Sequence, residues 1–271
     1  MTDTAQNFRT IILNDPANLP ESERKELINA FVELSYKTTG GKDWESYRPA
    51  IEGWKDYYNA VGARPQDYNR LVLIYDHQTL VHFTGVTLFE LEPEHRFVWM
   101  RSSMTLKQYH GAGLLKTAIL SVLSPEWLRQ LGEVYFIIRT ANPIVYEATR
   151  NLVRDYAADP DLGLDWNLYP EINDAGELDP VPNEIRDLAV RATEKISPGC
   201  AFVPETFVNK GYFKSFGALY REPVFPCHNP ATQSYFQRVV EYSNQDGLLI
   251  LVHMRTRQVF AGAGGKGESK N

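Results

Sequence analysis

Two glycines, Gly111 and Gly113, stand between a largely apolar run at residues 96–100 and a run with helical spacing that begins at Leu114. A strand followed by a glycine-bearing loop and the start of a helix can hold phosphate. The first amides of a helix have no partner inside the helix, and the helix dipole adds partial positive charge at that end. Glycine also permits positive φ and leaves no Cβ in the way of an anion. The stretch therefore predicts an anion site made of backbone N–H groups.

The elements around this loop must form a sheet that mixes strand directions. Strand-like patterns cover residues 70–75, 80–91 and 95–104, with a hairpin turn signal at 76–78, and such a succession favours an antiparallel meander. The helix over 113–123 then crosses to the apolar run 134–140, which can lie parallel to the strand before the loop. Elsewhere the patterns predict strands at 8–13, within 202–220 and at 247–254, and helices from about Ser22 and at 45–61, 126–131, 144–153, 183–196 and 229–242.

The loop itself reads Gln108-x-x-Gly111-x-Gly113. This pattern, with its strand before and helix after, resembles the acyl-CoA loop of the GNAT superfamily of N-acyltransferases, and the resemblance covers roughly residues 70–153. It implies an α/β fold, an α+β mixed sheet of the GNAT type, with extra helices in an insertion after the fourth core helix. The alternative is a tight β–α turn whose glycines serve packing only, because a short motif is by itself a hypothesis.

The same resemblance implies a set of cofactor-binding residues for acetyl-CoA or another acyl-CoA as co-substrate. The diphosphate would lie on the loop amides, which belong to Gln108, Tyr109, His110, Gly111, Ala112, Gly113 and Leu114. The pantetheine arm would pair with the strand before the loop, at Arg101, Ser102 and Ser103. One of those three amides would polarise the thioester carbonyl as charge grows on its oxygen.

Two further residues follow the strand at 134–140. Asn142 stands where many members of the family contact CoA, and as the residue before Pro143 it is also a favoured N-cap, so it can serve either role or both. The family's general acid is often a Tyr on the next helix, but Thr149 occupies about that position here. Tyr146 shares a helix face with Thr149. It is the predicted general acid, and a packed Tyr bonded to backbone is the alternative.

The general base is not identified by the sequence. Amine deprotonation needs a carboxylate or a His near the site, and the candidates on the flanking strands and in the loop are Glu90, Glu92, His82, His95 and His110. The six His and two Cys show no close spacing of the kind that holds a metal, so no metal is expected.

Composition narrows the class of protein. The chain has 271 residues, a net charge of −6 and only two cysteines, Cys200 and Cys227. No basic cluster suggests nucleic acid as a partner. No apolar stretch is long enough to span a bilayer, and the first residues do not resemble a secretory signal. We expect a cytoplasmic protein with reduced thiols, a monomer or homodimer.

An acidic excess is confined to residues 155–187, which hold ten acidic side chains against Arg186 as the one base. We expect one GNAT-like domain over 1–260 with an acidic insertion at about 155–200, and a disordered tail at 261–271. Two interpretations of the acidic segment stay open. It is either a solvated loop or an edge of the acceptor pocket that attracts a cationic amine.

The sequence thus predicts an acyl-CoA-dependent N-acyltransferase, in the first instance an acetyltransferase, that acts on a small-molecule amine by direct transfer. No G-x-S-x-G motif and no cysteine in an active-site context suggests a covalent acyl intermediate. One alternative is a non-catalytic GNAT-like module that binds CoA or a partner. Another keeps the fold but uses a carrier-protein thioester or a decarboxylation.

Overall fold

The computed structural model describes residues 8–39, 64–92, 95–158, 163–216 and 226–256. The predicted helix at 45–61 and the predicted tail at 261–271 lie outside these residues.

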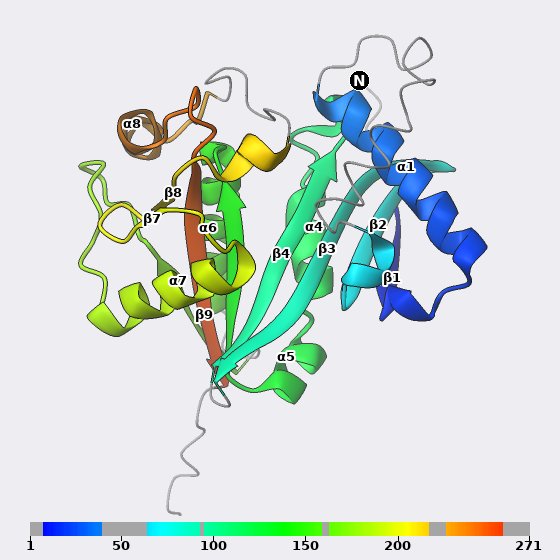
Figure 1. The fold of residues 1–271 in the computed structure, drawn as a ribbon, viewed down its shortest axis with the longest axis horizontal. Coiled ribbons are helices and arrows are strands. Elements are labelled where there is room, and N and C mark those ends of the chain that lie inside the picture. The colour runs from blue at the N-terminus through cyan, green and yellow to red at the C-terminus, as the bar shows by residue number, and fades with distance from the viewer. Residues whose placement is uncertain (1–7, 40–63, 93–94, 159–162, 217–225, 257–271) are drawn as a thin grey trace, which may run out of the picture.

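One mixed sheet forms the centre of the described structure (Figure 1). Its strands follow the order β1-β2-β3-β4-β5-β9-β8-β7, and β6 pairs with β9 beside β8. The only parallel neighbours among the described strands are β4 and β5, as the sequence predicts. The bounds are β1 Arg9–Asn14, β2 Arg70–Asp76, β3 Thr79–Glu92, β4 His95–Thr105, β5 Val134–Thr140, β6 Leu164–Tyr169, β7 Phe202–Val203, β8 Val208–Asn209 and β9 Gly247–Thr256.

Helices cover both faces of this sheet. In Figure 1, α1 and α7 lie in front of the strands, whereas α4 and α6 lie behind them. The bounds are α1 Glu21–Thr39, α4 Leu114–Val122, α5 Pro125–Leu131, α6 Pro143–Ala157, α7 Asn183–Ile196 and α8 Pro230–Val239. Short 3₁₀ turns complete the list, at η1 Pro16–Asn18, η3 Pro65–Asp67, η4 Lys107–Tyr109 and η6 Tyr212–Phe216. The predicted mixed α/β class is confirmed.

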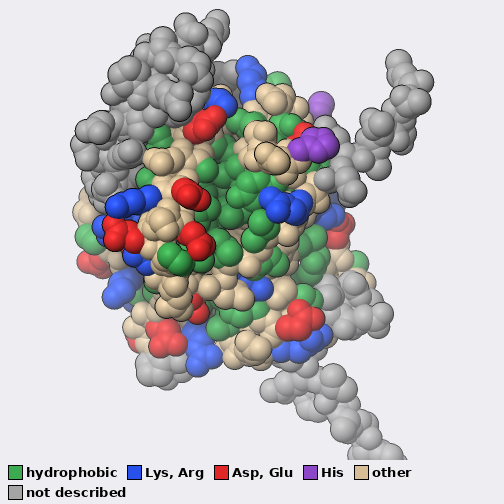
Figure 2. Space-filling view, turned by 90° about the vertical axis from the view of Figure 1, so that its right-hand side faces the viewer, with side chains coloured by type: hydrophobic (Ala, Val, Ile, Leu, Met, Phe, Trp, Pro, Cys, Tyr) green, Lys and Arg blue, Asp and Glu red, His purple; other side chains and the backbone are tan. Residues whose placement is uncertain are grey.

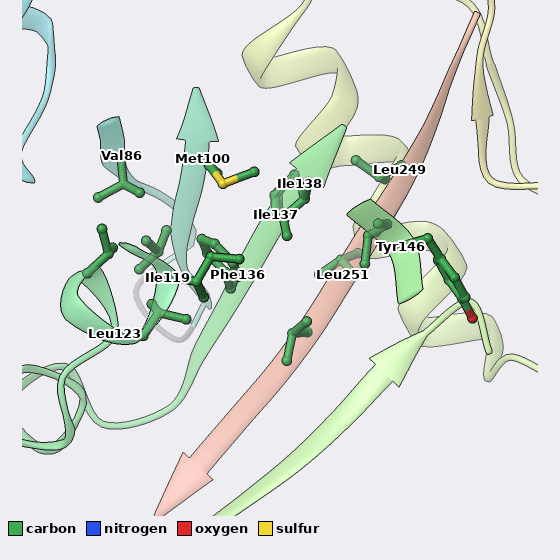
Figure 3. Packing of buried hydrophobic residues seen from close by; sticks show 14 of the residues in the cluster. Val86, Met100, Ile119, Leu123, Phe136, Ile137, Ile138, Tyr146, Leu249 and Leu251 are labelled. Atoms are coloured by element: carbon green, nitrogen blue, oxygen red, sulfur yellow. The ribbon is translucent and has the colours of Figure 1, made fainter. Parts of the chain in front are cut away.

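The continuous apolar run of β5 follows from this two-sided cover. Every residue of β5 is buried, because helices pack on both faces. Figure 3 shows one side of this core, where Ile119 of α4 and its C-cap residue Leu123 approach Val86 of β3 and Phe136 of β5. A strand with one face in water would instead alternate apolar and polar residues.

The acidic segment differs from the sequence prediction. We expected a loop-rich insertion, but Leu164–Tyr169 forms β6 and extends the sheet beside β9. Several of its acids have basic partners on distant elements: Asp155 with Lys116, Asp165 with Arg255, and Glu177 with Arg238. Some of the acidic side chains of this segment thus form ion pairs with other parts of the domain.

Among the described strands, β1 forms the other edge of the sheet. β1 pairs only with β2 in the described structure. Figure 2 views the molecule from this side and shows hydrophobic side chains between charged ones. Ile12 on β1 is 40% exposed.

Candidate functional site

The two parallel strands part midway along their length. Residues 96–99 of β4 pair with residues 134–137 of β5, and the pairing ends there. Yet β4 continues to Thr105 and β5 to Thr140, and Figure 1 shows the two strands diverging towards those ends. The peptide groups on the β5 side of β4 beyond Trp99 therefore have no strand partner among the described residues.

A β-bulge explains where the strands part. Val86 of β3 faces Met100, whereas its neighbour Gly85 faces Ser102, so Arg101 is an extra residue in β4. A bulge bends its strand and re-aims the side chains next to it. This one lies at the first of the three positions that the resemblance assigns to the pantetheine arm.

Gly85 is a feature that the sequence analysis overlooked. A Cβ at this position would lie 2.4 Å from the ring of Tyr68, so only glycine lets that ring rest on the sheet opposite the bulge. Burial raises the pKa of Tyr68 to about 12, although the nearby Ser102 hydroxyl acts in the opposite direction. An isolated glycine inside a strand pattern is the signal that would have indicated a bulge or a close approach.

The predicted anion loop is open to solvent. Gly111 has φ +86° and Gly113 has φ +75°, and a Cβ built on either would meet nothing within 4 Å. Residues 110–113 are exposed, and α4 begins directly after them. No side chain caps this helix, because its N-cap is Gly113. Among the residues that the structure describes, the turn is thus neither buried nor blocked by a neighbour.

Some of the predicted loop amides are already used within the turn. The N–H groups of Tyr109, His110 and Ala112 donate to the carbonyls of Leu106, Lys107 and Tyr109. Those of Gln108, Gly111, Gly113 and Leu114 have no acceptor among the described residues. These four, rather than all seven, are the donors that an anion can reach.

Side-chain contacts fix the turn in place. The Tyr109 hydroxyl donates to Asp76 at 2.6 Å, which ties the turn to the hairpin between β2 and β3. Its ring also makes an edge contact with Phe8, with 6.0 Å between centroids. Because Tyr109 is held by these contacts, it positions the turn, and the side chain of His110 remains exposed.

A chain of hydrogen-bonded polar side chains links β3 to the end of β4. His82 is fully buried, with Nδ1 2.7 Å from the Thr105 hydroxyl and Nε2 2.9 Å from the Thr84 hydroxyl. The Thr84 hydroxyl lies 2.8 Å from that of Ser103. Burial lowers the pKa of His82 to about 3. With both ring nitrogens engaged and no access to solvent, His82 is not suited to accept a proton from a bound amine.

The other base candidates on the flanking strands lie at the far end of β4. Glu90 contacts Arg96 at 3.2 Å. Glu92 contacts His95 at 3.5 Å and also pairs with Arg191. These contacts are near the beginning of β4, whereas the bulge and the turn are near its end. The structure brings none of these candidates to residues 101–103.

The surroundings of Tyr146 favour a packing role over the predicted role as general acid. Its side chain is fully buried on α6, where the hydroxyl donates to the Pro170 carbonyl at 3.1 Å and accepts from the Ile172 N–H at 2.8 Å. Burial raises its pKa further above the usual value. Figure 3 shows the ring directed away from Met100 and β4. Tyr146 anchors the segment after β6, as the alternative interpretation held.

Thr149, which occupies the family's usual position, is buried too and donates to the Val145 carbonyl at 2.9 Å. Asn142 does act as the N-cap of α6, since its side-chain oxygen accepts from the Ile144 N–H at 2.9 Å. Its contact with CoA stays a prediction. The side-chain NH₂ group has no acceptor within α6 or its cap, so it is available to donate.

The described residues contain neither a metal-binding cluster nor a membrane-spanning helix. Within those ranges, no group of three or more His, Cys, Asp or Glu side chains is placed to hold a metal ion. None of the helices that the structure describes is long and apolar enough to cross a membrane.

No protein-family profile matches the sequence, and no curated protein does. Among solved structures, 53 chains match. One is the PaiA N-acetyltransferase of Thermoplasma acidophilum in complex with coenzyme A, at 16% identity, 53% of this chain, 87% of that chain and TM-score 0.33. Another is the ribosomal-protein alanine N-acetyltransferase of Escherichia coli, at 7% identity, 92% of this chain, 94% of that chain and TM-score 0.39.

A third is the diaminobutyrate acetyltransferase of Paenibacillus lautus with L-2,4-diaminobutyric acid and coenzyme A, at 12% identity, 65% of this chain, 89% of that chain and TM-score 0.34. Other matched structures are described as GNAT family acetyltransferases. The matched structures named here are acetyltransferases. At these identities and TM-scores, residue roles in this chain rest on its own geometry.

Proposed function

We propose that this protein is an acyl-CoA-dependent N-acyltransferase that acts on a small-molecule amine by direct transfer. The observation that carries the proposal is the open, uncapped turn at residues 110–113, which leads into α4. It follows the one strand that separates from its parallel neighbour. Backbone N–H groups at a helix start hold a diphosphate, and unpaired peptide groups of β4 can hold the amide-rich arm that follows it.

Acyl transfer at this site depends on positioning and on backbone donors. With the diphosphate on the turn, the arm would run along β4 past the bulge, and an N–H group of residues 101–103 would donate to the thioester carbonyl. The amine nitrogen attacks the carbonyl carbon and forms the C–N bond of the amide, the C–S bond breaks, and the proton that the amine loses ends on the thiolate to give the free thiol. A hydrogen-bond donor aimed at the growing oxyanion stabilises the transition state and so raises the rate of acyl transfer by a large factor.

Calorimetric titration with acetyl-CoA tests the binding step, and release of free thiol in the presence of an amine panel tests turnover. We expect saturable binding and thiol release that depends on amine. Absence of acetyl-CoA binding at about 1 mM ligand, which corresponds to a free energy weaker than roughly −4 kcal/mol, would overturn the proposal.

A specific observation supports a second candidate, a CoA-binding module without turnover. Tyr146 is buried with its hydroxyl bonded to backbone. His82 is buried with both ring nitrogens engaged, and Glu90, Glu92 and His95 lie away from the bulge. Saturable acetyl-CoA binding without thiol release from any amine would favour this candidate. Amine-dependent thiol release would exclude it.

The acceptor is proposed to be a small amine without a fixed charge preference. The acidic residues that would have formed a cationic-amine pocket include three with basic partners, Asp155, Asp165 and Glu177. A panel that contains both mono- and polyamines would show whether added positive charge lowers KM.

A further inference from the structure

A cavity lies at the opposite end of α4 from the turn. Its volume is about 410 Å³, and it opens between the end of β1, the start of β2 and helix α5. Its lining is rich in polar and charged groups, among them Asn14, Asp15, Asn69, Arg70, Glu126 and Trp127. The nine residues of α4 separate it from the turn, a rise of about 13 Å.

Arg70 is the central group of this cavity. Its side chain is only 9% exposed, and its guanidinium lies over the ring of Trp127, with 5.1 Å from Cζ to the centroid. Nη1 donates to the Val122 carbonyl at 2.8 Å and to the Ser124 hydroxyl at 3.4 Å. Nε is buried without an acceptor, and Nη2 has none among the described residues. A guanidinium has five N–H donors, so Arg70 retains capacity beyond its contact with the end of α4.

Two carboxylates lie at the same cavity without a basic partner. Asp15 follows β1, and its N–H donates to the Asn69 carbonyl at 2.8 Å, which holds the residue at φ +47°. Glu126 lies in the first turn of α5. In the described chain, neither side chain forms an ion pair. Burial lowers the pKa of Arg70, and the negative charge of Glu126 acts in the opposite direction. Glu126 therefore interacts electrostatically with the guanidinium although the two groups form no ion pair.

We infer that this cavity binds a small zwitterion of the amino-acid type. Its carboxylate would accept from Nη2 of Arg70, which has no acceptor among the described residues, and its ammonium would face Asp15 and Glu126. A simple anion would meet two uncompensated carboxylates, and a simple cation would meet the guanidinium, whereas a molecule with both charges satisfies both. The cavity volume suffices for an amino acid and falls within the usual range for small-ligand sites.

The side-chain end of the ligand would meet a mixed surface. Leu88 and the ring of Trp127 supply apolar contact, and Asn14 and Gln130 supply amides that can donate or accept. This lining favours neutral amino acids over charged ones. The site is separate from the acyl-CoA turn, so the inference does not depend on the proposed transferase activity.

Titration of ¹⁵N-labelled full-length protein with amino acids tests the inference through the Trp127 indole signal, which is assigned by its loss in Trp127→Phe. We expect glycine, alanine, serine or glutamine to shift this signal saturably. Acetate and ethylammonium, the two halves of the ligand, should bind at least about tenfold more weakly. Failure of every amino acid to shift the signal at about 10 mM would overturn the inference. Equal binding of acetate would also overturn it, because the site would then be one for anions.

Charge-neutralising variants give a second test with little structural cost. Asp15→Asn keeps a residue type that tolerates positive φ, and Glu126→Gln changes an exposed side chain. Each should weaken amino-acid binding about tenfold and leave acetyl-CoA binding unchanged. Glu194→Gln, at an exposed position on α7, is the matched control and should change neither. Unchanged amino-acid affinity in both Asp15→Asn and Glu126→Gln would contradict the inference.

Discussion

Two strand-to-helix junctions follow the parallel strands, and they are constructed in opposite ways. The junction after β4 has glycines at positive φ, an N-cap without a side chain, and amides with no acceptor among the described residues. The junction after β5 has Asn142 as a side-chain cap and Pro143 at the first helical position, and the following turn buries Tyr146 with its hydroxyl fully bonded.

The difference shows which junction is available to a ligand. A helix start has unsatisfied N–H groups by geometry, and they must find an acceptor in the chain, in water or in a ligand. At the β5 junction a side chain accepts from one of the first helical N–H groups. This stabilises the helix, but that N–H group is then not available to a ligand. At the β4 junction the chain leaves the donors exposed. The following variants test this contrast, from the largest expected effect to the smallest.

Gly113→Val should weaken acetyl-CoA binding about a hundredfold, because a β-branched residue at φ +75° strains the turn and turns its amides away. Calorimetric titration measures the loss. Gly199→Val is the matched control: that glycine is also exposed, has φ +79° and meets open space, but it follows α7. Equal loss of CoA affinity in the control would show that strain, rather than the turn, is responsible.

Tyr146→Phe should lower the free energy of unfolding by about 2 to 3 kcal/mol, since it leaves the buried N–H of Ile172 without an acceptor. Urea denaturation measures this change, and thiol release should remain as in the parent protein. Tyr235→Phe removes only a hydroxyl that donates to the Thr206 carbonyl, so a smaller loss is expected there. A drop in turnover with unchanged stability would restore Tyr146 as a catalytic residue.

Acidification should destabilise the protein through His82. Its pKa is about 3 in the folded state and about 6.5 when unfolded. The unfolded chain therefore binds a proton first as pH falls. The stabilisation present above the unfolded pKa is lost on the way down, by roughly 2 kcal/mol between about pH 7 and about pH 5.

Urea midpoints measured across this range in the parent and in His82→Gln test this expectation. The variant should show a smaller dependence on pH, whereas His77→Gln, at a 96% exposed hairpin position, should match the parent. An identical pH dependence in His82→Gln would contradict the assignment.

Asn142→Ala should lower the free energy of unfolding by about 1 kcal/mol through loss of the cap. Asn142→Ser keeps an acceptor for the Ile144 N–H but removes the side-chain NH₂ group. Weaker acetyl-CoA binding in Asn142→Ser at nearly parent stability would establish the predicted CoA contact. Unchanged acetyl-CoA binding in both variants would show that Asn142 acts only as the N-cap of α6.

The sequence predicted the strands and helices of the described region well where periodicity was strong. The apolar run of β5, the hairpin before β3 and the helix after Asn183 occur as expected. The strand Leu164–Tyr169 was missed because acids and prolines around it indicate a loop, whereas pairing with β9 outweighs that local preference. The bulge at Arg101 has no signal in β4 itself, since the extra residue is defined only by its partner strand.

The sequence alone determined that a glycine-bearing turn joins a strand to a helix without a capping side chain, because the positions of the glycines are local properties of the chain. Only the tertiary structure decided that β4 and β5 part beside that turn and that Tyr146 and His82 are sealed in the core. It also brought Arg70 together with Asp15 and Glu126 in one cavity. Those outcomes depend on strand register and on which faces pack together, and both are fixed by contacts between residues far apart in the chain.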